Sequence, residues 1–267
     1  MSLYSKAIAG RSLPKIIGPS GMDTALQPFL ARNKVGYWCP PGNATTLPGV
    51  FGYTVPITTT ATTRAVATTN MFTRMRRLGI VSTAAIGNVS SFRVAVAQFT
   101  LGNGTGLGGF FKIIRFGISD AVVVATARMA LGVWSATGAM TNVEPSTLTN
   151  FIGVGHGAAD ANFKIFYGGS VAQTPIDLGV DFPSNTTNTD VYEFALFAPP
   201  SSDNTVHYEF TRLNTGHVAA GTLTGAAGVV LPSPATLLSP QQGMRTNNLT
   251  AAAAGFDVMS DYIETDQ

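Results

Sequence analysis

The sequence is poor in the residues on which most catalytic and metal sites depend. Cys39 is its only cysteine, which excludes an intrachain disulfide and a metal held by a cluster of cysteines. Its histidines are His156, His207 and His217, and none of them has the spacing of a known zinc motif. No G-x-S-x-G segment offers an activated serine. We therefore expect no enzyme activity, no metal site and no cofactor.

Charged residues are scarce as well, at 11% of the 267 residues, with 5 Lys and 4 Glu in the whole chain. This composition disfavours long helices, whose exposed faces usually carry Lys and Glu. In their place stand 33 Thr and 29 Gly, which favour strands and turns, while 45% hydrophobic residues exclude a disordered chain. The composition predicts an all-β protein with one large domain.

Long hydrophobic runs are also absent. No apolar stretch approaches the roughly 18 residues that a membrane-spanning helix needs, and residues 1–20 lack the unbroken apolar core of a signal peptide. We expect that the protein is made in the cytoplasm and that it does not insert into a membrane.

Two regions follow each other along the chain. Residues 1–70 contain many prolines and no sustained period, which predicts an irregular N-terminal arm that attaches the protein to a partner. Residues 71–267 are predicted to form an antiparallel, jelly-roll-like β-sandwich with the C-terminal tail packed on it. Its strands are predicted at 91–100, 110–118, 128–134, 163–167, 191–197, 206–213 and 218–223. Turn-rich stretches separate them at 102–109, 153–160, 168–175, 182–190 and 198–204.

The net charge of +2 hides an uneven distribution of charge. Up to Arg128 there are 13 Lys or Arg against Asp23 and Asp120, whereas the remainder holds three basic residues against 12 acidic ones. The basic half is predicted to meet the acidic half of the same chain or of a neighbouring subunit; nucleic acid is the less favoured partner because the chain as a whole is only weakly basic.

Arg74, Arg76 and Arg77 form the tightest basic cluster. Arg74 and Arg76 are predicted on the polar face of a strand that begins the sandwich, with acidic partners from the second half. All three are candidates for charge contacts between subunits.

Several short phrases occur in order along the chain: GNATTLPGVFG (42–52), RMRRLG (74–79), KIIRFGISD (112–120), DLGVDFP (177–183), YEFALFAPP (192–200), YEFTRLNTG (208–216), MRTNN (244–248) and DYIETD (261–266). Together they resemble a family of structural proteins of tailed bacteriophages, known as tail fibre or virion appendage proteins. The similarity covers roughly residues 37–267 and carries no catalytic signature.

The resemblance implies a virion protein made in the bacterial cytoplasm, assembled as a homotrimer and docked to other virion proteins through its N-terminal arm. Exposed polar loops at 102–109, 168–175 and 183–190 are then candidates for contact with a host-surface glycan. The candidate contact residues in them are Asn103, Thr105, Gln173, Asn185 and Asn188.

Two other functions remain open at this stage. A capsid-surface decoration or head-fibre protein would use the same fold and differ only in where the arm docks. A glycan depolymerase, which is less favoured, would need two nearby carboxylates, and the candidate pairs are Asp177 with Asp181 and Glu193 with Glu209.

Overall fold

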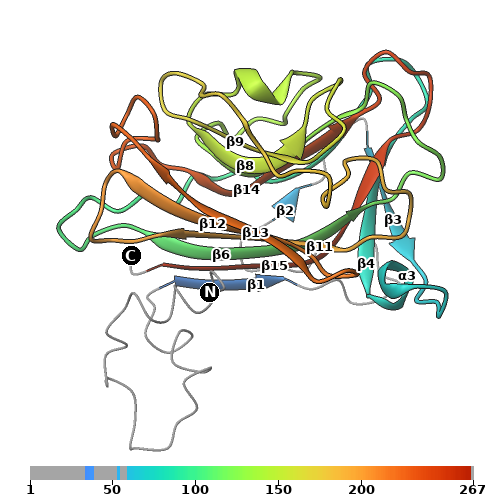
Figure 1. The fold of residues 1–267 in the computed structure, drawn as a ribbon, viewed down its shortest axis with the longest axis horizontal. Helices are drawn as coiled ribbons and strands as arrows, with labels where there is room; N and C mark the ends of the chain where they lie inside the picture. Colours follow the sequence, from blue (N-terminus) through green and yellow to red (C-terminus); the bar gives the residue numbers. More distant parts are fainter. Residues whose placement is uncertain (1–33, 39–52, 55–58, 266–267) are drawn as a thin grey trace, which may run out of the picture.

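The protein is a sandwich of two antiparallel β-sheets (Figure 1). The computed structural model describes residues 34–38, 53–54 and 59–265. This architecture confirms the all-β, antiparallel sandwich that the composition and the strand pattern predict. Among the described residues, no helix is long and apolar enough to cross a membrane.

The first sheet contains the central strand pair β6 and β15, which align along most of their length. Strand β1 (Lys34–Trp38) pairs with β15 beyond the stretch of β15 that pairs with β4. Across this sheet the order is β13 (His217–Thr224), β12 (Thr205–Arg212), β11 (Tyr192–Ala198), β6 (Phe110–Ile118), β15 (Gly255–Thr265), β4 (Arg77–Ser82) and β3 (Thr59–Arg64).

The second sheet curves around the segment that joins β7 to β8 (Figure 1). That segment, residues 135–150, contains the short 3₁₀ helix η1 (Pro145–Thr147), and its Met140 and Leu148 pack on Ala130, Phe151 and Met244 on the outer face of the sheet. The order is β10 (Ile176–Asp177), β9 (Lys164–Gly168), β8 (Phe151–His156), β7 (Arg128–Trp134), β14 (Ser239–Thr246), β5 (Val89–Val94) and β2 (Tyr53–Thr54).

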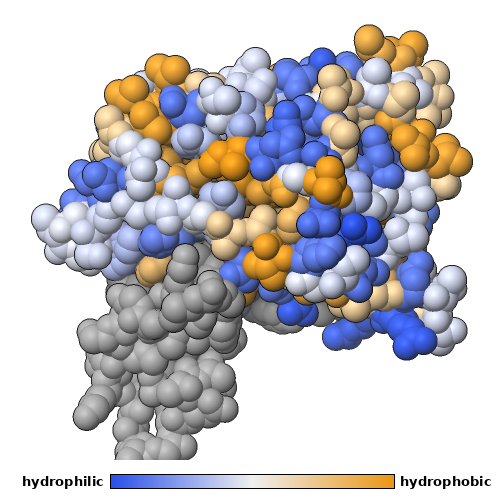
Figure 2. All heavy atoms as spheres, in the orientation of Figure 1, coloured by the Kyte–Doolittle hydropathy of each residue, from blue (hydrophilic) through white to orange (hydrophobic). Residues whose placement is uncertain are grey.

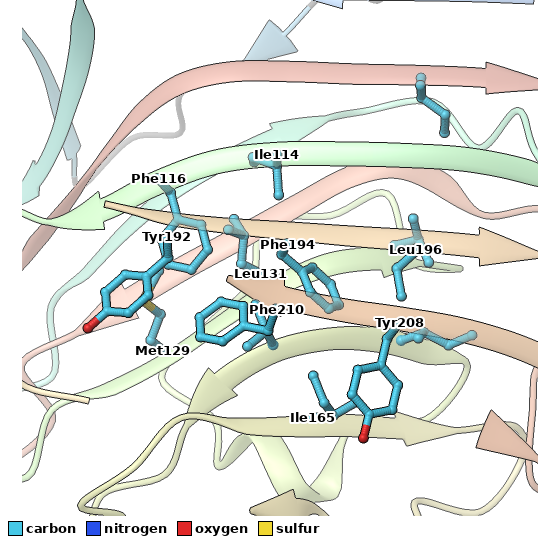
Figure 3. Close-up of a cluster of buried hydrophobic side chains, with 14 of the residues drawn as sticks. Ile114, Phe116, Met129, Leu131, Ile165, Tyr192, Phe194, Leu196, Tyr208 and Phe210 are labelled. Carbon is cyan, nitrogen blue, oxygen red and sulfur yellow. The ribbon is translucent and has the colours of Figure 1, made fainter. Parts of the chain in front are cut away.

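Apolar side chains from both sheets fill the space between them (Figure 3). At one end of this core lies an aromatic cluster formed by Phe116, Phe163, Tyr192 and Phe210, all with almost no exposed surface. The Tyr192 and Phe210 rings stack with their centroids 5.3 Å apart, and Phe163 meets Tyr192 edge-on at 4.8 Å. Burial of these large rings removes much apolar area from water and stabilises the contact between the sheets.

The strands β6 and β7 have the predicted bounds, but the sequence misses β8 and β14. The stretch 153–160 is predicted as a turn, whereas residues 153–156 belong to β8, in the interior of the second sheet. The glycines there serve close packing of the backbone, since a Cβ at Gly155 would collide with the Met129 carbonyl oxygen of β7. Glycine therefore marks strand contact here, and not a turn.

Both ends of the chain contribute more to the sheets than the sequence predicts. The arm expected at residues 1–70 includes β1, β2 and β3, which pair with β15, β5 and β4. Residues 65–70 of the arm lead into the helix that begins at Met71, and the remaining residues of the arm lie outside the described residues. The expected C-terminal tail instead forms β14 and β15, which lie inside the two sheets, because each finds pairing partners on both of its edges.

Around the basic cluster, the structure differs from the strand that the sequence predicts. Residues Met71–Arg74 form the short helix α3, capped by the Asn70 side chain, which accepts a hydrogen bond from the Thr73 amide at 2.8 Å. Strand β4 starts only at Arg77. Arg74 and Arg76 are thus not on a strand, because a local cap favours one helical turn there.

Candidate functional site

The predicted contact loops do not form one surface. The loops 102–109 and 168–175 lie at the end of the sandwich where β6 and β14 begin and β15 ends. The loop 183–190 lies at the opposite end, because it precedes β11, whose first residue Tyr192 pairs with Phe116 near the end of β6. A ligand of the size of one sugar residue cannot contact all three loops.

Most of the predicted contact side chains serve their own loops. The Asn103 carboxamide oxygen accepts hydrogen bonds from the Thr105 and Leu107 amides, and Gln173 donates to the Val171 carbonyl. Asn188 has a left-handed backbone with φ of 51° and donates to the Asp120 carbonyl. The Thr105 side chain is exposed at the loop tip.

The three arginines of the basic cluster also have different surroundings. Arg74 donates to the Thr68 carbonyl at the surface, and Arg76 is exposed. Arg77 is buried, and its Nε lies 2.9 Å from the Asp257 carboxylate in the same chain. Arg77 is therefore not a charge contact between subunits, because its acidic partner is inside its own sandwich.

The two halves of opposite charge meet within the chain. This is one of the two alternatives predicted from the sequence, the other being contact with a neighbouring subunit. Basic side chains of the first half pair with acidic ones of the second half, mostly on the first sheet, and Arg128 forms such a pair on the second sheet. One further pair, Arg245 with Asp120, has its basic residue in the second half and its acidic residue in the first. The pairs are Arg64–Asp257, Arg77–Asp257, Lys112–Asp261, Arg115–Glu193, Arg128–Glu144 and Arg245–Asp120.

A buried polar network lies at the end of the sandwich where β6, β8 and β14 stop. Arg245 of β14 has no exposed surface, and its guanidinium donates to the Asp120 carboxylate from Nε at 3.0 Å. The other Asp120 oxygen accepts from the Gly255 amide at 2.8 Å. Asn185, predicted to contact a glycan, lies with its side-chain oxygen 3.4 Å from Arg245. The network ties both sheets together.

His156 completes the network as a neutral acceptor. Its Nε2 lies 2.7 Å from Arg245 Nη1, which can only donate, and its Nδ1 faces the Gly157 carbonyl oxygen at 3.1 Å. Burial and the Arg245 charge lower the pKa of His156 to about 3. A protonated ring would place a second cation beside a buried guanidinium.

This network predicts a distinct loss of stability in acid. Because the unfolded histidine has a pKa near 6.5, the unfolded state binds one more proton than the folded state between about pH 6.5 and pH 3. Stability therefore falls as the pH drops through this window, by up to about 1.4 kcal/mol per pH unit. In the His156→Gln variant, whose amide oxygen can still accept from Arg245, urea unfolding at several pH values should show a shallower slope. Equal slopes for both proteins would contradict the prediction.

A hollow of about 400 Å³ opens beside this network. Arg64 at the end of β3, Val81 of β4, the segment 119–122 and the pair Ala252 and Ala253 line it. The Arg64 Nε lies 3.3 Å from the Asp257 carboxylate that Arg77 also contacts. Burial raises the pKa of Asp257, and the two guanidinium groups oppose this rise. Of these residues, only Arg77 is among those predicted from the sequence. The others are far apart in the chain, so no local motif indicates that they meet.

Exposed apolar side chains occur at this end of the molecule, and Figure 2 shows others over the rest of the same face. Ile86, Val122, Val123 and Leu249 are each more than half exposed. Their loops are joined by hydrogen bonds, such as that from the Gly87 amide to the Asn248 carbonyl at 2.7 Å. Val122 also lines the hollow, so the hollow has an apolar rim.

The carboxylates considered for glycan cleavage have other partners. Asp177 accepts from the Gly179 amide, and Asp181 lies 3.5 Å from His217. Glu193 pairs with Arg115 at 2.5 Å. Within the described residues, no three His, Cys, Asp or Glu side chains gather as a metal site.

The fold is that of the lectin β-sandwiches. No family model matches the chain, and no curated protein matches it. Peanut lectin is 10% identical, with a TM-score of 0.56 over 87% of this chain and 97% of that chain. Lectin II from Ulex europaeus is 11% identical, with a TM-score of 0.57 over 88% and 100%. A protein of unknown function from Shewanella oneidensis MR-1 is 11% identical, with a TM-score of 0.54 over 93% and 96%. Such low identities establish the fold and nothing finer.

Proposed function

We propose that this protein is a structural component of a tailed-phage virion, a tail fibre or appendage protein that binds a host-surface glycan without cleaving it. The observation that carries the glycan part is the lectin-type sandwich, which accounts for 86–88% of this chain in several lectin comparisons. One of those lectins is described as complexed with galactose. The sequence resemblance to phage appendage proteins supports the virion part, with the segment before β1 as the attachment to other virion proteins.

Assembly as a homotrimer is part of the same proposal. Strand β13 is an edge of the first sheet, paired with β12 over eight residues. Val218 of β13 is an exposed apolar side chain, and the strand contains no proline or Lys to block pairing. Such an edge is suited to strand pairing with a neighbouring subunit.

Two alternative functions are less favoured. A capsid-surface decoration or head-fibre protein fits the same fold. A depolymerase is less favoured because Asp177, Asp181 and Glu193 are each held by another group of the protein. Nucleic acid is not favoured as a partner, since many of the basic side chains of the first half pair with carboxylates of the same chain.

Three measurements on the full chain test the proposal. Sedimentation should give three times the chain mass of 27.8 kDa, and a monomer would contradict the trimer. Gold-labelled antibody on phage particles should mark the tail, whereas label on the head would favour the decoration alternative. On an array of bacterial surface polysaccharides the protein should bind without releasing new reducing ends, and release of such ends would support the depolymerase.

A further inference from the structure

The hollow beside β3 and β4 combines apolar walls with one unbalanced positive charge. Its volume of about 400 Å³ falls within the range of small-molecule sites. Val81, Ala121, Val122, Ala252 and Ala253 supply apolar surface. Such surface suits the C–H faces of a sugar ring, and the polar groups of the hollow are left to define orientation.

The positive charge comes from two arginines that share one carboxylate. Arg64 and Arg77 lie 3.3 Å and 2.9 Å from the same Asp257 oxygen, so the three side chains together carry one positive charge. Arg77 is buried behind Arg64, whereas the Arg64 side chain is 27% exposed and lines the hollow. The nearby Asp120 does not neutralise this charge because Arg245 already pairs with it.

The backbone beneath Arg64 is shaped to hold its guanidinium. A Cβ at Gly79 of β4 would collide with the Arg64 side chain, which therefore lies flat against the strand. Arg64 Nε faces the Asp257 carboxylate, whose nearest oxygen is 3.3 Å away. Ser119 also lines the hollow, and its hydroxyl interacts with Asp257. An arginine and a hydroxyl in one hollow fit a ligand with an acidic group and a neighbouring hydroxyl.

We propose that this hollow binds the carboxylate-bearing unit of a surface glycan, a hexuronic acid, with its carboxylate on Arg64 and its ring against Val122 and Ala253. This inference deepens the proposed function and rests on its glycan-binding part. It assigns the acidic class of sugar, and it moves the contact from the polar loops to the junction of β3, β4 and the segment after β6.

The test uses the full chain with sodium glucuronate, glucose and inorganic phosphate as separate probes in isothermal titration calorimetry. Glucuronate should bind at least tenfold more tightly than glucose, because the neutral sugar lacks the charge-assisted hydrogen bonds to Arg64. Added salt should weaken glucuronate binding. Phosphate that binds as tightly as glucuronate would overturn the assignment to a sugar acid.

Three variants locate the site. Arg64→Gln should weaken glucuronate binding roughly tenfold or more. Arg93→Gln removes the same charge from β5 of the other sheet and should leave binding unchanged. Ala253→Phe fills the hollow from an exposed position without a change of charge, and it should also abolish binding even if Arg64→Gln perturbs folding. Glucuronate binding that survives both hollow variants would overturn the inference.

The two proposals fail in different ways. Binding of neutral glycans on the array, with no response to Arg64→Gln, would leave the proposed function and remove the acidic site. Glucuronate binding that depends on Arg64, in a protein that antibody does not find on phage particles, would keep the site and remove the virion role.

Discussion

Replacement of Asp120 with alanine is expected to lower the free energy of unfolding by about 3–5 kcal/mol. The change leaves Arg245, which has no exposed surface, without a counter-charge, because His156 is neutral and Asn185 offers only a weak hydrogen bond. It also leaves the Gly255 amide without its acceptor. Urea unfolding at a fixed protein concentration measures the loss.

A second variant separates the charge effect from the loss of packing. In Asp120→Ala with Arg245→Met, no isolated charge remains, so the double variant should recover part of the loss. Asp203→Ala removes an exposed carboxylate and should change stability by less than about 0.5 kcal/mol. The prediction fails if Asp120→Ala and Asp203→Ala have the same stability.

Phe163→Ala should be about as damaging, with a loss of about 3–5 kcal/mol in the same assay. The Phe163 ring lies within 6.1 Å of the ring centroids of Phe116, Tyr192, Phe210 and His156, so its removal leaves a cavity where the two sheets meet. The loss combines the transfer of the ring to water with the contacts that its neighbours can no longer make.

Phe163→Leu should lose less, since a leucine fills part of the space and stays apolar. Val180→Ala is the surface control, because Val180 is 84% exposed and its truncation opens no cavity. A Phe163→Ala protein as stable as the Val180→Ala protein would show that the aromatic cluster does not stabilise the sandwich.

The sequence predicts those strands that carry bulky alternating side chains. Phe110–Ile118 and Arg128–Trp134 have the bounds expected of them. Strand β8 escapes prediction because Gly153 and Gly155 resemble turn residues, although they serve close contact with β7. Strand β14 escapes because Pro240, Gln241 and Gln242 look like loop residues, while all three are buried and the glutamines find polar partners inside the fold.

The candidate site is harder to predict than the strands. Polar loop residues such as Asn103 and Asn188 suggest ligand contact, yet Asn103 fixes its own loop and Asn188 ties its loop to the Asp120 carbonyl after β6. The hollow depends on Arg64, Ser119 and Ala253, which only the pairing of β3, β4 and β15 brings together. Short-range sequence patterns do not show that these residues are close in space, because each contact joins parts of the chain that are distant in sequence.

The placement of β14 and β15 constrains how the chain acquires its structure during translation. Each sheet needs one of these late strands in its interior, so β4 and β6, and likewise β5 and β7, have no common neighbour until ribosomes have made residues beyond 239. Until then both sheets are incomplete and have unpaired strand edges. Slow closure of the sandwich is expected, because its sheets depend on pairing between segments remote in the sequence.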